Sequence, residues 1–172
     1  ENLTGAADSN DTFQFMAQGT LAGGVDGGTG GHDSLVFTGG NFTSLRFAAT
    51  GTQSGTVMTD TRTISFAGLE PVTFLGTTQD IVIDLRGLAV VIPGPAPPIV
   101  LGSTGQNGFQ SLTGGFETFH FTNPLRSLTI QLGFGNDVFS VGTLGVNFGA
   151  DLIIDGGPGI DTTSFVQDLR LA

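Results

Sequence analysis

A pattern that occurs twice between residues 127 and 165 limits what this chain can fold into. Each copy contains a short apolar segment, a Gly-rich turn that ends in Asp, and the start of a second segment. Equivalent residues are separated by 24 positions, as in Ile130 and Ile154 or Asp137 and Asp161. A constant period between about 20 and 50 residues indicates structural units that stack on one another.

A longer internal match carries this spacing toward the N-terminus. Residues 68–87 align without gaps with residues 115–134, and the offset of 47 positions is close to two periods. Glu70 and Glu117 are one of the matched pairs in this alignment. One period of 22 to 24 residues therefore accounts for most of the chain.

The composition favours β-structure. Gly accounts for 29 of the 172 residues, Cys, Trp and Tyr are absent, and all 15 aromatic residues are Phe. Phe, Val, Ile and Thr suit half-buried strands, whereas good helix formers are scarce. We predict one all-β domain, residues 1–172, folded as a single-stranded right-handed parallel β-helix, a β-solenoid with Gly/Asp-rich turns. An antiparallel β-sandwich is the alternative, because it too has short strands at regular spacing.

A Pro-rich segment interrupts the repeat at residues 93–115. Proline has no backbone N–H to donate to a neighbouring strand, so we expect an irregular Pro/Gly-rich loop there. Insertions into stacked repeats often lie on the binding face. A tolerated surface insertion is the simpler interpretation.

The charge of the chain excludes some partners. The formal net charge is −10, and the five basic residues are all Arg, without a cluster. Nucleic-acid binding needs clustered Lys and Arg, so we expect no nucleic-acid partner. No apolar run approaches the roughly 18 residues of a membrane-spanning helix, so we expect no membrane insertion.

Four turns approach the pattern G-G-x-G-x-D-x-U-x, in which U is a large apolar residue. Their aspartates are Asp11, Asp33, Asp137 and Asp161. Stacking at the 22- or 24-residue spacing would place Asp11 over Asp33 and Asp137 over Asp161. Two stacked carboxylates repel each other, and a bound cation would remove that repulsion, so these residues are candidate Ca²⁺ ligands. The alternative is that they only cap turns through bonds to the backbone.

The turns resemble the calcium-binding nonapeptide repeats of RTX-type secreted proteins. More widely, GGVDGGTGGHDSL and FHFTNPLRSLTIQLGFGNDVFSVG resemble the RTX-like and haemagglutinin-like repeats of very large bacterial secreted or surface adhesins. In the RTX family the nonapeptides run in tandem, whereas in this chain they are isolated, about one per coil. The resemblance implies a β-helical module of a longer secreted or cell-surface polypeptide, with Ca²⁺ between stacked turns and a role in adhesion or scaffolding. It transfers no catalytic residues.

We therefore expect a structural or adhesive module of an extracellular bacterial surface or matrix protein, stabilised by calcium. Its expected partners are neighbouring repeats, or identical subunits stacked end to end into a filament, together with cell-surface glycans. The alternative is a carbohydrate-binding or polysaccharide-degrading β-helix that uses the segment 93–115. The absence of Trp and Tyr, which sugar sites favour, argues for the first of these two functions.

The sequence presents no catalytic constellation, and we do not expect an enzyme. Arg86, beside Asp84, is the nearest candidate for a lyase base, although a surface ion pair is the simpler interpretation. Asp80 and Asp84 lie four residues apart on one strand face, so they cannot oppose each other across a cleft as hydrolase carboxylates do.

Overall fold

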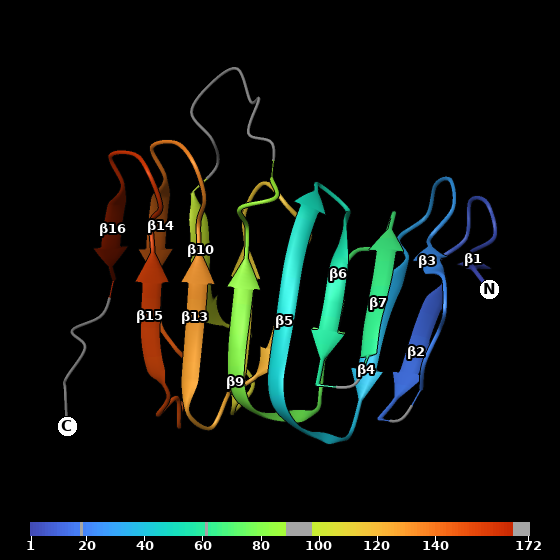
Figure 1. Ribbon diagram of the computed structural model, residues 1–172, viewed down its shortest axis with the longest axis horizontal. Helices are drawn as coiled ribbons and strands as arrows, with labels where there is room; N and C mark the ends of the chain where they lie inside the picture. Colours follow the sequence, from blue (N-terminus) through green and yellow to red (C-terminus); the bar gives the residue numbers. More distant parts are fainter. Residues whose placement is uncertain (18, 61, 89–97, 167–172) are drawn as a thin grey trace.

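The computed structural model describes residues 1–17, 19–60, 62–88 and 98–166. Within these ranges the chain forms sixteen strands and no helix, and the strands make two eight-stranded sheets that lie face to face (Figure 1). We call the sheets A and B. Accordingly, this part of the chain contains no helix that could cross a membrane.

Each sheet can be followed strand by strand from one edge to the other. Sheet A consists of β1 (Leu3–Thr4), β3 (Gly24–Asp26), β7 (Arg62–Ala67), β6 (Ser54–Thr59), β5 (Asn41–Gly51), β9 (Thr77–Asp84), β13 (Ser127–Gln131) and β15 (Asp151–Asp155). Sheet B consists of β16 (Thr162–Phe165), β14 (Val138–Val141), β10 (Ile99–Ser103), β11 (Phe109–Thr113), β12 (Phe119–Thr122), β8 (Val72–Phe74), β4 (Ser34–Thr38) and β2 (Thr12–Met16).

The spacing seen in the sequence is the register of parallel strand pairs. Strand β13 lies beside β15 with Ile130 opposite Ile154, and β8 lies beside β12 with Phe74 opposite Phe121. Side chains at equivalent positions therefore point to the same side of the sheet. Matched residues in the sequence are neighbours in space.

The predicted β-helix is nevertheless wrong. The sheets are mixed, because β6 runs antiparallel to both β5 and β7, and β11 runs antiparallel to both β10 and β12. These hairpins interrupt the one-way winding, and the described strands form two open sheets in place of a closed solenoid. The all-β class is confirmed, and the arrangement is closer to the β-sandwich alternative, with mixed sheets in place of purely antiparallel ones.

The described part of the Pro/Gly-rich stretch at 93–115 contains two of these hairpin strands. Strands β10 and β11 pair with each other between Val100–Thr113 and Ser103–Gln110. Residues 93–97 lie outside the described residues. The segment expected to protrude as a loop therefore contributes two strands to the middle of sheet B.

The core lies between the sheets and is rich in Phe. The rings of Phe47 in sheet A and Phe119 in sheet B stack with centroids 4.4 Å apart and an interplanar angle of 9°. Both side chains are fully buried. Of the positions predicted to face inward, Leu128, Ile130, Phe139 and Val141 are buried, while Leu152 and Ile154, on the last strand of sheet A, are partly buried.

Candidate functional site

The structure brings each predicted aspartate pair together at the start of adjacent parallel strands. The backbone N–H of Asp11 donates to Oδ1 of Asp33 at 2.7 Å. The N–H of Asp137 donates to Oδ1 of Asp161 at 3.0 Å. The stacking of Asp11 with Asp33, and of Asp137 with Asp161, is therefore as the sequence spacing predicts.

These side chains serve the backbone of the turns. Oδ2 of Asp11 accepts hydrogen bonds from the N–H of Ala6 at 2.7 Å and from the hydroxyl of Ser9 at 2.9 Å. The side chain of Asn10 likewise accepts from the N–H of His32, one strand away, at 2.9 Å. Side-chain oxygens that satisfy turn N–H groups are the capping alternative that the sequence left open.

The description of the chain as calcium-binding needs correction. Among the described residues no group of three or more His, Cys, Asp or Glu side chains is arranged to hold a metal ion. Ca²⁺ takes about six to eight oxygen ligands, and an isolated pair of aspartates that also bond the backbone falls short of that number. The physical reason is the isolated turn: one Asp per turn gives only a pair of the predicted aspartates, and one carboxylate of each pair caps the backbone of its neighbour. Ca²⁺ as a cofactor stays an untested prediction.

The pair Asp137 and Asp161 is less completely satisfied than the pair Asp11 and Asp33. Oδ2 of Asp137 is buried without a hydrogen-bond partner among the described residues. Burial and, to a smaller extent, the charge of Asp161 raise the pKa of Asp137. Asp33 and Asp161 therefore each accept the backbone N–H of the other aspartate in their pair, whereas Oδ2 of Asp137 accepts no hydrogen bond among the described residues.

A row of acidic side chains continues from the first aspartate pair across sheet B. The parallel registers of β4 with β8, and of β8 with β12, place Glu70 next to Asp33 and Glu117 next to Glu70. The N–H of Glu70 also donates to the carbonyl oxygen of Asp33. We call Asp11, Asp33, Glu70 and Glu117 the acidic row.

The two glutamates of the acidic row were not among the predicted site residues. The signal was present, because Glu70 and Glu117 occupy equivalent positions of the two matched segments. Neither glutamate lies in a turn that resembles G-G-x-G-x-D-x-U-x, so a search for that pattern does not find them. Glu117 is unusual because it is buried, and its burial depends on the tertiary structure.

The acidic row differs in exposure along its length. Asp33 and Glu70 line a cavity of about 190 Å³ together with His32, Gln53 and glycines of the turn before β4. Gln53 donates to Oε2 of Glu70 at 3.0 Å. Glu117 is 1% exposed, and neither of its carboxyl oxygens has a hydrogen-bond partner among the described residues.

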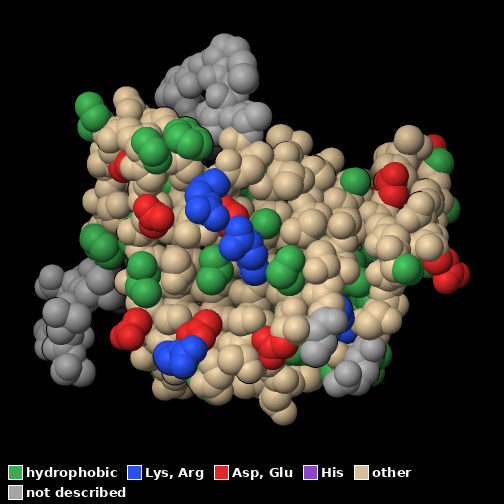
Figure 2. All heavy atoms as spheres, viewed as in Figure 1, with side chains coloured by type: hydrophobic (Ala, Val, Ile, Leu, Met, Phe, Trp, Pro, Cys, Tyr) green, Lys and Arg blue, Asp and Glu red, His purple; other side chains and the backbone are tan. Residues whose placement is uncertain are grey.

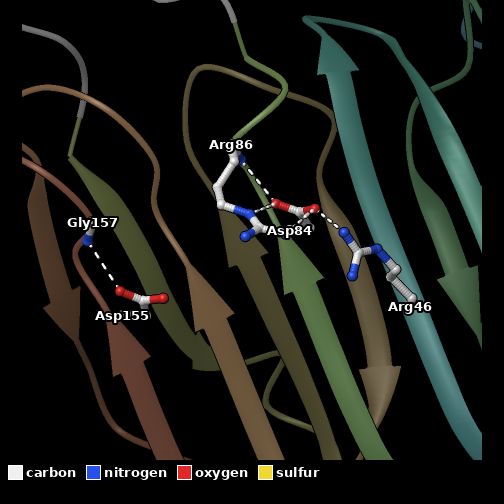
Figure 3. Close-up of polar contacts among 5 residues, drawn as sticks. All are labelled: Arg46, Asp84, Arg86, Asp155 and Gly157. Atoms are coloured by element: carbon white, nitrogen blue, oxygen red, sulfur yellow. Dashed lines mark hydrogen bonds and ion pairs between the residues drawn. The ribbon is translucent and has the colours of Figure 1, made fainter.

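The outer face of sheet A carries the ion pairs (Figure 2). Asp84 on β9 lies between Arg46 from β5 and Arg86 just beyond β9, whose Nε donates to Oδ1 of Asp84 at 2.9 Å (Figure 3). The hydrogen bond that Arg86 donates to Asp84, together with the charge of Asp84, raises the pKa of Arg86. Arg86 therefore stays protonated in an ion pair, as the simpler interpretation of the sequence has it.

The outer face of sheet B has a different character. Its outward positions alternate along the strands with inward-facing residues, most of which are buried Phe, Leu or Val, and none of the described outward residues is Asp, Glu, Lys or Arg. They are Thr12, Gln14, Met16, Ser34, Val36, Thr38, Thr73, Val100, Gly102, Phe109, Ser111, Thr113, His120, Thr122, Val138, Ser140, Thr162 and Ser164. We call this surface the uncharged face.

Hydroxyl groups of the uncharged face form hydrogen-bonded pairs between neighbouring strands at its two edges. Thr12 and Ser34 share a hydrogen bond of 3.0 Å between β2 and β4. The hydroxyl of Ser164 donates to that of Ser140 at 3.2 Å between β16 and β14. Neighbouring strands are spaced by about 4.8 Å, so each pair holds two hydroxyl groups about that far apart along the face.

An aromatic pair lies within the uncharged face. The rings of Phe109 on β11 and His120 on β12 have centroids 6.0 Å apart and are tilted by 56°. Burial lowers the pKa of His120, so its imidazole is neutral at pH 7. The pair therefore adds partly exposed aromatic surface to the uncharged face without adding charge.

Comparison with known proteins gives no relative. No family model matches the sequence, and no curated protein or solved structure matches it.

Proposed function

We propose that this chain is an adhesive module of an extracellular polypeptide and that its uncharged face binds the surface of a neutral polysaccharide. The observation that supports the proposal is the segregation of charge. A chain with a net charge of −10 has no charged side chain among the described outward positions of a whole sheet.

The chemistry of the uncharged face matches that of a neutral glycan surface. Sugars present hydroxyl groups, which both donate and accept hydrogen bonds, beside apolar C–H faces. Ser and Thr hydroxyls can likewise donate and accept, and Val36 and Phe109 supply apolar contact. A charge on this face would lose its hydration on binding and find no opposite charge.

The shape of the sheet favours packed chains over a single free oligosaccharide. A cavity of about 300 Å³ lies over β1, β3 and β7 of sheet A, and the cavity of about 190 Å³ lies beside the acidic row. Neither opens on the uncharged face. Binding there would rely on many weak contacts spread over a broad surface.

Carbohydrate binding is the alternative that the sequence offered, and the absence of Trp and Tyr argued against it. The pair of Phe109 and His120 supplies aromatic surface in their place. The role needs no catalytic residue. Stacking with neighbouring repeats or identical subunits into a filament stays a separate proposal, which this binding role neither requires nor excludes.

The test is depletion of the protein from solution by insoluble polysaccharides. Cellulose, chitin and β-1,3-glucan particles serve as neutral probes, and calcium alginate beads as the anionic probe. Thr73→Asp places a charge in the middle of the uncharged face, between Val36 and His120. Thr129→Asp is the matched control, because it lies between two parallel strands on the outer face of sheet A, beside Val82 and Ile153.

We expect depletion by at least one neutral polysaccharide, unchanged in 1 M salt because no ion pair contributes. Thr73→Asp should weaken this binding by about tenfold, or about 1.4 kcal/mol, and Thr129→Asp should leave it unchanged. Equal losses in the two variants, binding to alginate alone, or no binding to any neutral probe would each contradict the proposal.

A further inference from the structure

We infer that Glu70 and Glu117 form a proton-dependent joint between β8 and β12, which is stable while Glu117 is protonated and is weakened when both carboxyl groups are ionised. This inference concerns the stability of sheet B. It does not depend on the proposed binding of polysaccharide.

The geometry of the joint follows from the strand register. Val72 lies opposite Phe119 in the parallel pair of β8 and β12, and each glutamate precedes its strand residue by two positions. The N–H of Val72 donates to the carbonyl oxygen of Thr118 at 3.0 Å between them. The two carboxyl groups therefore start from adjacent backbone positions between two interior strands of sheet B, with four further strands beyond β12 and two beyond β8.

The environment of Glu117 favours a neutral carboxyl group. The side chain is 1% exposed, and both of its oxygens lack hydrogen-bond partners among the described residues. An ionised carboxylate in such a place loses its hydration without compensation, whereas a protonated one loses much less. Glu70 differs from Glu117, because it is exposed and accepts a hydrogen bond from Gln53.

The charged groups around Glu117 do not relieve this cost. Glu70 faces it from the turn before β8, and Asp33 lies beyond Glu70 in the acidic row. His120, on β12 itself, lies on the outer face and is neutral. The described arginines have other partners: Arg46, Arg86 and Arg126 pair with aspartates of sheet A, and Arg62 lies over Phe37 and Phe42.

These surroundings have a definite consequence for titration. Burial, with a further contribution from the charge of Glu70, raises the pKa of Glu117 to about 8. The N–H of Thr118 opposes this shift, although it does not lie in hydrogen-bond geometry. The folded chain therefore keeps a proton that the unfolded chain releases near the ordinary glutamate value of 4.5.

The direction of the pH effect follows from this difference. Because the folded state binds the extra proton, the stabilisation is complete below pH 4.5, declines as the pH rises, and is lost once the pH passes about 8. Within that window one proton is released on unfolding. The unfolding constant then rises about tenfold for each pH unit.

The experiment measures urea unfolding of the full chain at pH values between 6.5 and 9. This range lies above the titration of ordinary carboxyl groups. Imidazole and α-amino groups in general titrate near or within it, so the difference between the wild type and Glu117→Gln assigns the pH dependence to Glu117. The variants are Glu117→Gln and Glu70→Gln, and the matched control is Glu1→Gln, an exposed residue away from the joint.

For the wild type and Glu1→Gln we expect the unfolding constant to rise roughly tenfold between pH 6.5 and 8 and then to level off. Glu117→Gln should remove this rise. Glu70→Gln should move the end of the rise to lower pH, because Glu117 then ionises more easily. A wild type with no pH dependence in this range, or a Glu117→Gln variant that keeps it, overturns the inference.

A second measurement decides the matter if Glu117→Gln does not fold. The chain has three glutamates, so ¹³C labelling of glutamate carboxyl groups gives few resonances to follow by NMR. We expect one resonance of the wild-type protein to titrate with a midpoint near pH 8. If all three titrate below pH 6, Glu117 is ionised in the folded protein and the joint does not exist.

Discussion

Replacement of Asp33 tests whether the predicted site residues act as turn caps. The side chain of Asp33 is 3% exposed and its Oδ1 accepts the N–H of Asp11 at 2.7 Å. A hydrogen bond to a charged group contributes about 1.5–3 kcal/mol to stability, and Asp33→Ala leaves a partly buried N–H without its acceptor. Removal of one charge from the acidic row offsets part of the loss. We therefore expect a destabilisation of about 2 kcal/mol.

Two other variants separate capping from the loss of charge. Asp33→Asn keeps an acceptor oxygen in the same place, so we expect a loss below about 1 kcal/mol. Asp161→Ala removes the equivalent bond to the N–H of Asp137, but beside β16, whose residues are exposed. Water can replace the lost acceptor there, so this loss should also stay below about 1 kcal/mol.

The assay is thermal unfolding followed by circular dichroism, with EDTA and with millimolar CaCl₂. For a chain of this length about 2 kcal/mol corresponds to a fall in Tm of roughly 4–8 °C for Asp33→Ala. If Asp33→Asn is as unstable as Asp33→Ala, capping is not the role of this side chain. If calcium raises the Tm of the wild type and Asp33→Ala abolishes the rise, the calcium prediction returns in place of capping.

Two further predictions concern the core and the outer face of sheet A. Phe47→Ala removes the ring that stacks on Phe119 with centroids 4.4 Å apart, and it should lower the free energy of unfolding in urea by about 3–5 kcal/mol. Phe134→Ala, at a position 77% exposed, is the control and should change that free energy by less than about 0.5 kcal/mol. Equal effects of the two variants would contradict the assigned core. Burial alone would raise the pKa of Asp84, but the hydrogen bonds and charges of Arg86 and Arg46 outweigh it and hold the pKa below 3.8. The stabilisation by Asp84 is therefore present above pH 4 and is lost as the pH falls below that value. Asp84→Asn should make the free energy of unfolding depend less steeply on pH between pH 4 and 2. An unchanged pH dependence would show that the arginines do not stabilise the charge of Asp84.

The sequence predicted strand registers well because the repeat records which side chains are neighbours. Ile130 and Ile154 match in sequence since both face the core from adjacent parallel strands. The direction of a strand leaves no such record. The alternation of residues 54–59 is the same whether that strand runs with or against its neighbour, so β6 and β11 could not be recognised as antiparallel.

The candidate sites were predictable in part for the same reason. Asp11 and Asp33 belong to Gly-rich turns that recur at one spacing, and the structure places them together. The burial of Glu117 depends on strands that are distant in the sequence, so no local sequence pattern predicts it. The uncharged face likewise becomes visible only when it is known which eight strands share sheet B.

The antiparallel strands β6 and β11 have a consequence for how the length of this protein can change. Each belongs to an excursion of two extra strands, after which the chain again runs in the direction it had before. An even number of added strands preserves the polarity of everything that follows, whereas an odd number would reverse it. The architecture can therefore be lengthened or shortened in steps of two strands while the flanking parallel partners keep their orientation.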